Sequence, residues 1–192
     1  FIPLEADESG LPVAILRYKV RNTGAQAADV SIAWSLENPV GIDPRVRSTA
    51  GGRVNEFRSQ AGLDGLFMSG PKCGLAAPMA GSMVLAVLNA GAGKVSHLRG
   101  WPRAKWWASA LLFWDDFSAD GLLGPEAEKQ NAVGSVNLQR TVAPGMEAEF
   151  TFLLAWHFPD RTPAWCGWSG ATCGWRRSNC RRWHRVAMST SR

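Results

Sequence analysis

Residues 135–161 read SVNLQRTVAPGMEAEFTFLLAWHFPDR, and this segment decides the fold class of the chain. Apolar and polar residues alternate in two runs, one on each side of the turn Ala143-Pro144-Gly145. A period of two is typical of a β-strand with one buried face. The segment therefore predicts two antiparallel strands of a packed sheet. The second strand is expected to bury the side chains of Ala148, Phe150, Phe152, Leu154 and Trp156.

The N-terminal part of the chain repeats this pattern. Two alternating runs, residues 13–22 and 28–37, lie on either side of the turn sequence Asn22-Thr23-Gly24. Asn and Gly tolerate the backbone angles of a tight turn, so we interpret the runs as a β-hairpin with one solvent-facing side. Such hairpins are the unit of β-sandwich domains. The inward residues are expected to be Ala14, Leu16, Tyr18 and Val20 in the first run, and Ala28, Val30, Ile32, Trp34 and Leu36 in the second.

The middle of the chain predicts shorter elements. Residues 38–62 are rich in Gly, Pro and Arg and predict a loop. Residues 63–68 predict a short strand, and residues 82–89 predict a strand that is apolar on both faces. Residues 94–98 are expected to pair with the latter across the turn Gly91-Ala92-Gly93.

An aromatic-rich segment follows, and its spacing is closer to helical than to extended. It predicts a short helix over residues 109–119, with Gly121 able to end it and a loop over residues 122–132. The expected fold is therefore mostly β: an incomplete antiparallel β-sandwich with one short helix and an irregular or disordered C-terminal tail.

Composition separates this tail from the rest of the chain. Hydrophobic residues make up 46% and charged residues 19%, which is typical of a globular protein. The formal net charge is +5, but residues 1–160 hold 14 Lys and Arg against 16 Asp and Glu, whereas residues 161–192 hold seven Arg and no acid. The basic charge thus belongs to the tail. The longest apolar runs are too short to span a bilayer, so no transmembrane segment is expected.

We interpret residues 162–192 as a non-native or frameshifted tail, because Arg, Trp and Cys are frequent there and no period of two or 3.6 is present. Cys166, Cys173, Cys180 and His184 are separated by gaps of six, six and three residues, which suit a tetrahedral zinc site poorly, so no metal is expected. Nucleic-acid binding by the Arg and Trp residues is a weaker alternative, which deletion of the tail would test.

The aromatic segment also holds the candidate functional residues. Asp115 and Asp116 are adjacent acids, but neighbouring helical residues point about 100° apart, so capping, surface charge or a domain contact is favoured over paired-carboxylate catalysis. Trp101, Trp106 and Trp107 form either a sugar-stacking platform or part of a core or interface. His157 is expected on the face of its strand opposite the core. The full set of candidate domain-interface or sugar-contact residues is Trp101, Trp106, Trp107, Trp114, Asp115, Asp116, Phe117 and His157.

Four segments together resemble glycoside hydrolase family 116, which includes bacterial β-glucosidases and the non-lysosomal (bile acid) glucosylceramidase. The resemblance covers about residues 1–168, and its last segment is the most specific. The segments are FIPLEADESGLPVAILRYKVRNTG at 1–24, ADVSIAWSLEN at 28–38, FWDDFSADGLL at 113–123 and VAPGMEAEFTFLLAWHFPDRTPAWCGW at 142–168.

This resemblance implies an N-terminal β-sandwich that supports a C-terminal (α/α)6 catalytic domain. A Glu nucleophile and an Asp acid/base lie in that second domain, so no catalytic residue is carried onto this chain and no cofactor is implied. Residues 1–161 are then a partial N-terminal domain whose first strands are missing, and the expected partner is the catalytic domain of the same protein, through which alone a β-glucoside would be bound.

The expected function is therefore the support of a retaining β-glucosidase or glucosylceramidase. The alternative is a free-standing β-sandwich module that binds glycans or proteins, which would present exposed Trp101, Trp106 or Trp107. A cytoplasmic location is favoured.

Overall fold

The computed structural model describes residues 10–42, 52–74, 79–105 and 108–159. This part of the chain is mostly β, which confirms the predicted fold class; the predicted tail lies outside the described residues. The elements are β1 (Val13–Arg21), β2 (Ala28–Glu37), β3 (Val54–Gln60), β4 (Leu63–Ser69), β5 (Ser82–Leu88), β6 (Lys94–Leu98), α2 (Ala108–Asp120), β7 (Val133–Val142) and β8 (Glu147–His157).

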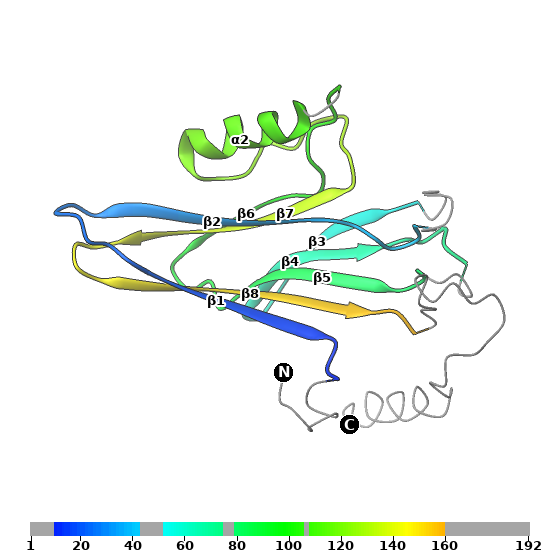
Figure 1. Cartoon of the computed structure of the whole chain (residues 1–192), viewed down its shortest axis with the longest axis horizontal. Helices are drawn as coiled ribbons and strands as arrows, with labels where there is room; N and C mark the ends of the chain where they lie inside the picture. Colours follow the sequence, from blue (N-terminus) through cyan, green and yellow to red (C-terminus); the bar gives the residue numbers. More distant parts are fainter. Residues whose placement is uncertain (1–9, 43–51, 75–78, 106–107, 160–192) are drawn as a thin grey trace, which may run out of the picture.

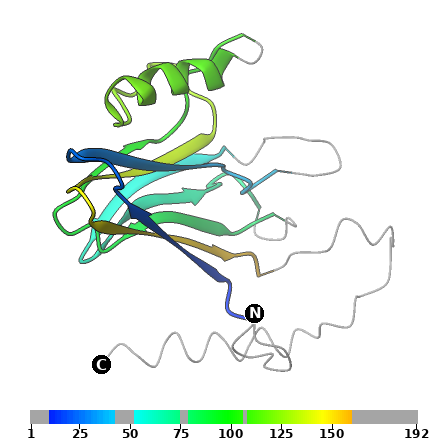
Figure 2. The ribbon, with the colours of Figure 1, turned by 60° about the vertical axis from the view of Figure 1, so that its left-hand side comes forward.

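The strands form two antiparallel sheets that pack face to face. The larger sheet has five strands in the order β1-β8-β5-β4-β3, and the smaller has three in the order β2-β7-β6. Helix α2 lies on the outer side of the smaller sheet (Figure 1, Figure 2). The core between the sheets consists of apolar side chains with no solvent exposure: Leu66, Met68, Leu85, Val87, Val136, Leu138, Phe150 and Phe152.

Both predicted hairpins are wrong, although all four strands are present. β1 pairs with β8, and β2 pairs with β7, so the two strands of each predicted hairpin lie in different sheets. Alternation identifies the buried face of a strand, but it does not identify the neighbouring strand. The two turns that connect the layers contact each other instead. The N–H of Asn22 donates to the carbonyl of Met146 at 2.9 Å, and the N–H of Gly145 donates to the carbonyl of Asn22 at 2.8 Å.

The structure tests three further predictions for the middle of the chain. The strands predicted over residues 63–68 and 82–89 are confirmed as β4 and β5. The loop predicted over residues 38–62 is wrong in part because it contains β3, an edge strand whose side chains are mostly exposed and therefore show no apolar alternation. β6 forms as predicted but pairs with β7 in the opposite sheet rather than with β5.

The predicted helix is confirmed as α2, and Gly121 ends it. Gly121 has a φ of +73°, which favours glycine, and its N–H donates to the carbonyl of Phe117 at 2.9 Å. A Cβ at this position would also lie 2.5 Å from the hydroxyl oxygen of Ser31 on the sheet below. Glycine is thus required here by the backbone and by the close approach of helix and sheet.

The predicted buried faces are largely confirmed. Phe150 and Phe152 are fully buried, and Val20, Val30, Ile32, Trp34, Leu36 and Ala148 pack against the core as partly buried residues. Trp156 is 36% exposed, near the end of β8, so the prediction that it is buried is wrong. Ala28 is likewise exposed at the start of β2. Tyr18, also expected inward, is 37% exposed on the edge strand β1. The alternation predicts the face correctly, but the facing sheet covers strand ends and edge strands only in part.

Aromatic pairs link the edge strands of the two sheets on both sides of the sandwich. On one side Tyr18 of β1 lies against Trp34 of β2, with ring centroids 6.5 Å apart. On the other side Phe57 of β3 is stacked on His97 of β6, with ring centroids 3.8 Å apart and ring planes 5° from parallel. These pairs cover the two open sides of the core, where no hydrogen bonds between the described strands join the sheets.

The His97 contact makes stability depend on pH. Burial lowers the pKa of His97 from its ordinary value of 6.5; nearby Glu126 opposes this effect and Arg99 adds to it. The unfolded chain therefore binds this proton more readily than the folded chain. We expect the stabilisation to be complete above pH 6.5 and to be lost as the pH falls from 6.5 through the lower folded pKa.

The variant His97→Phe keeps an aromatic stack with Phe57 and removes the titrating group. Urea unfolding of both proteins at about pH 7.5 and about pH 5.5 measures the difference. The natural chain should lose more stability on acidification than the variant. Identical losses in the two proteins would show that His97 does not contribute to the pH dependence.

Candidate functional site

Ring contacts hold helix α2 and the segment before it together. Phe113 is stacked on Trp101 with centroids 4.6 Å apart, and Phe117 lies 5.9 Å from Phe113. The indole N–H of Trp101 donates to the hydroxyl of Ser135 on β7 at 2.8 Å. Trp101 is half-buried, and its polar atom is already bonded within the protein. Its geometry therefore favours a packing role over a sugar-stacking platform.

A buried polar layer lies between the smaller sheet and α2. The side-chain amide of Asn137 donates to the carbonyl of Gly121 and to the hydroxyl of Ser96, both at 3.0 Å. Gln139 donates to the carbonyl of Asp120 at 2.9 Å. The sequence suggests that these alternate residues of β7 face solvent, but α2 and its flanking segments cover them. They position the end of the helix, and no local signal in the sequence distinguishes them from exposed residues.

The two adjacent acids, Asp115 and Asp116, do not act as a pair. Asp115 is exposed, whereas a carboxylate oxygen of Asp116 accepts a hydrogen bond from the N–H of Gly124 at 3.1 Å. Asp120 similarly accepts from the N–H of Leu122 at 2.8 Å. Asp116 and Asp120 thus hold the chain that leaves α2.

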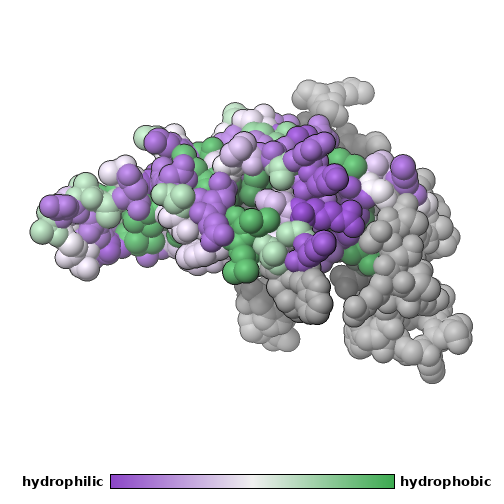
Figure 3. Space-filling view, turned by 90° about the horizontal axis from the view of Figure 1, so that it is seen from above, coloured by the Kyte–Doolittle hydropathy of each residue, from purple (hydrophilic) through white to green (hydrophobic). Residues whose placement is uncertain are grey.

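The outer face of α2 carries large apolar side chains in solvent. Leu111 is 64% exposed, Leu112 44% and Trp114 59%. Trp114 also contacts Phe117 edge-to-face at 6.3 Å, which anchors its ring to the helix. We call Leu111, Leu112 and Trp114 the helix surface. Figure 3 looks onto the side of the molecule that carries α2 and shows hydrophobic residues exposed among hydrophilic ones.

The structure brings together only part of the candidate set. Trp101, Trp114, Asp115, Asp116 and Phe117 all belong to α2 or the segment before it. His157 is exposed at the end of β8 in the other sheet, opposite Ser82 of β5, and is therefore not part of this cluster. Trp106 and Trp107 lie outside the described residues. Whether the candidates contact a sugar or another domain remains a prediction.

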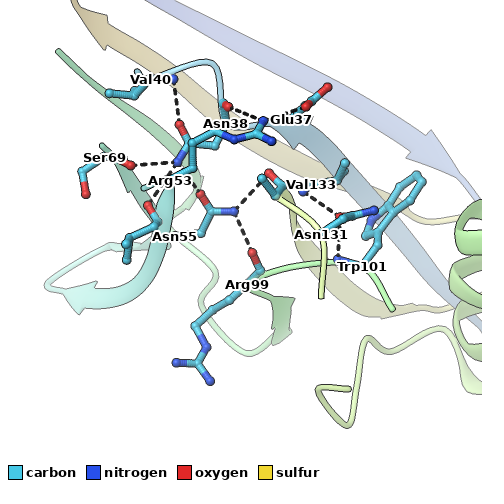
Figure 4. A network of polar contacts seen from close by, with 12 residues as sticks. Glu37, Asn38, Val40, Arg53, Asn55, Ser69, Arg99, Trp101, Asn131 and Val133 are labelled. Carbon is cyan, nitrogen blue, oxygen red and sulfur yellow. Dashed lines mark hydrogen bonds and ion pairs between the residues drawn. The ribbon is translucent and has the colours of Figure 1, made fainter. Parts of the chain in front are cut away.

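A polar network that the sequence does not predict joins the two sheets at one end (Figure 4). The side-chain amide of Asn38, at the end of β2, lies 2.9 Å from the side-chain oxygen of Asn55 on β3. Asn55 in turn donates to the carbonyl of Arg99 at 2.6 Å and to that of Ala132 at 3.3 Å. These bonds connect β2, β3 and the segments on both sides of α2. The sequence gives no sign of this network, because Asn38 and Asn55 lie in the segment that is predicted to be a loop.

An ion pair beside this network fixes the base of the segment that carries α2. Arg99 donates from its Nε to both carboxylate oxygens of Glu126 at 2.8 Å. Hydrogen bonds from Arg99 are the main reason that the pKa of Glu126 falls from 4.5 to about 2. Glu126 is therefore ionised throughout the physiological range and is a hydrogen-bond acceptor rather than a proton donor.

The comparison with protein families agrees with this sandwich. The sequence model described as "beta-glucosidase 2, glycosyl-hydrolase family 116 N-term" matches residues 1–186. The chain belongs to this family. The resemblance to family 116 is thus confirmed, and a glycosidase parent is supported at the family level. The match runs past residue 161, where the predicted sandwich domain ends, and the non-native origin of the tail remains a prediction.

Two further observations apply to the described residues of this family 116 domain. None of its helices there is long and apolar enough to cross a membrane. Within the same residues, His, Cys, Asp and Glu do not gather in a group of three or more that could hold a metal ion. The site in these residues consists of helix α2 with its aromatic contacts, the buried polar layer beneath the helix, and the polar network at one end of the sandwich.

Proposed function

We propose that this chain is the supporting β-sandwich of a retaining β-glucosidase of the glucosylceramidase type, and that bond cleavage takes place on a separate C-terminal catalytic domain. The family match carries the proposal, because it covers residues 1–186 and its description is that of a beta-glucosidase N-terminal domain. A Glu nucleophile and an Asp acid/base on the catalytic domain suffice for this hydrolysis, so no cofactor takes part. No residue of this chain is assigned to the reaction.

The proposed contact with the catalytic domain is the helix surface. Exposed apolar groups that lie together commonly mark an interaction site, and Leu111, Leu112 and Trp114 are large apolar side chains of α2 that are exposed. The aromatic contacts beneath them and the buried amides of Asn137 and Gln139 hold the helix in place. A rigid helix of this kind suits the positioning of a second domain.

Activity measurements test the proposal that bond cleavage takes place only on the catalytic domain. The purified 192-residue chain should not hydrolyse an aryl β-glucoside, because it is not expected to carry the catalytic pair. Release of the aryl group above the buffer blank would contradict the proposal.

The helix surface is tested in the same chain and in a longer protein that includes the catalytic domain. The variant Trp114→Ala should change the stability of the 192-residue chain by no more than about 1 kcal/mol, because Trp114 is largely exposed and loses only its edge contact with Phe117. In the longer protein it should lower thermal stability and glucosidase activity. Ile15→Ala is the control, since Ile15 is equally exposed at 59% but lies on β1. Equal effects of both variants would remove the assignment.

The coding DNA tests the tail and the parent protein together. Read beyond the codon for Trp168, another frame should continue into an aromatic stretch and a helical domain that holds Glu and Asp candidates. If every frame is closed, the chain is better explained as a free-standing module that binds glycans or proteins.

A further inference from the structure

A solvent-open cavity lies at the end of the sandwich where β3 begins. Its walls also come from the segment that follows β6 and the segment that precedes β7. The cavity measures about 850 Å³, within the range of small-molecule sites. We call it the end pocket, and its principal side chains are Arg53, Asn55, Arg99, Arg103, Glu126 and Glu128.

The lining of the end pocket is polar and balanced in charge. Eight of its ten residues are Arg, Asn, Gln or Glu, and the other two are Ala. Its three arginines are matched by its two glutamates and by Glu37, whose carboxylate lies 2.7 Å from the guanidinium of Arg53. The lining together with Glu37 therefore has no net charge that would attract a strongly charged ligand, and no apolar wall against which an apolar ligand could pack. A neutral ligand rich in hydrogen-bonding groups fits this chemistry.

Hydrogen bonds within the protein fix the floor of the end pocket. Asn55 is held by two backbone carbonyls, and Arg53 donates to the carbonyl of Asn38 at 3.1 Å. The side-chain oxygen of Asn131 accepts from the N–H of Val133 at 2.8 Å. Groups that are fixed before binding lose little conformational entropy when a ligand arrives. Figure 4 shows this framework around Arg53, Asn55 and Asn131.

Other polar groups of the lining remain available to a ligand. Within the described residues the exposed side chains of Arg103 and Glu128 make no hydrogen bond or ion pair, and the side-chain nitrogen of Asn131 has no acceptor. The arginine and the amide are donors, and the carboxylate is an acceptor. A sugar hydroxyl both donates and accepts, and charged partners give the stronger hydrogen bonds.

We propose that the end pocket is a binding site for a neutral sugar of hexose size. Arg103 and Asn131 donate to its hydroxyl oxygens, and Glu128 accepts from a hydroxyl. The site is separate from the helix surface and carries no catalytic role, so it goes beyond the proposed function. Its occupancy does not depend on a second domain.

Titration of the full 192-residue chain with D-glucose, followed by the NMR signals of its backbone amides, tests the proposal. We expect saturable shifts in residues 99–103 and 126–132, with a dissociation constant in the millimolar range. The double variant Arg103→Ala, Glu128→Gln should weaken binding by about fivefold or more. Both side chains are exposed, so the variant is expected to fold.

The matched control is Arg17→Ala, which removes an exposed arginine that pairs with Glu149 on the larger sheet. It should bind glucose like the natural chain. The proposal is overturned if no saturable shift develops up to about 100 mM glucose. It is also overturned if Arg17→Ala weakens binding as much as the double variant, or if inorganic phosphate binds the same residues more tightly than glucose.

Discussion

Replacement of Phe152 by alanine is expected to lower the free energy of unfolding by about 3–5 kcal/mol. Phe152 is fully buried on β8, where its ring lies 6.2 Å from that of Tyr18 and 6.3 Å from that of Trp34. The variant loses the burial of the ring, leaves a cavity and removes both aromatic contacts. Since small domains are stable by about 5–15 kcal/mol, this is a large fraction of the total.

Equilibrium unfolding in urea measures the change, with Trp114→Ala as the matched control. Trp114 is also aromatic but is 59% exposed and has one ring contact, with Phe117, so its removal should change stability by no more than about 1 kcal/mol. Similar small changes in both variants would mean that Phe152 is not packed in the core as described.

Replacement of Asn38 by aspartate should cost about 3–5 kcal/mol at neutral pH without any change in side-chain size. Asn38 is fully buried, and its amide nitrogen lies 3.1 Å from the carbonyl oxygens of Val54 and Ser69 and 2.9 Å from the side-chain oxygen of Asn55. Aspartate places a charged oxygen against these three oxygens. The other carboxylate oxygen keeps the hydrogen bond from the N–H of Val40, which lies 2.9 Å from the side-chain oxygen of Asn38. Burial and the lack of a donor at the new oxygen nevertheless make the ionised form unfavourable.

The pH dependence of this loss identifies its cause. The same surroundings raise the pKa of the new carboxyl above its ordinary value of about 3.9 in the folded state. The loss should therefore be largest at neutral pH and should shrink as the pH falls toward about 4. The control is Asn89→Asp, an exposed position where stability should hardly change. A loss at Asn38 that stays constant with pH would contradict the electrostatic explanation.

The candidate site was only partly predictable from the sequence. The aromatic segment and its helical spacing predict α2, and Gly121 marks its end. The local sequence does not indicate which strands the helix packs against. The contact of Trp101 with Ser135 and the burial of the Asn137 and Gln139 amides are therefore seen only in the folded structure, where the helix lies on β7. His157, also a candidate, lies on the other sheet because sequence distance does not fix spatial distance.

The sequence by itself determined which segments other than β3 are extended and which face of most of them is buried. Phe150 and Phe152 show this clearly, because a strand turns successive side chains to opposite faces wherever it lies. Only the tertiary structure decided the strand partners: β1 with β8, β2 with β7, and β3 as an edge strand formed mostly from polar residues. It also decided that Asn38 is buried among oxygen atoms. Pairing and polar burial depend on residues far apart in the chain, and a local period carries no information about them.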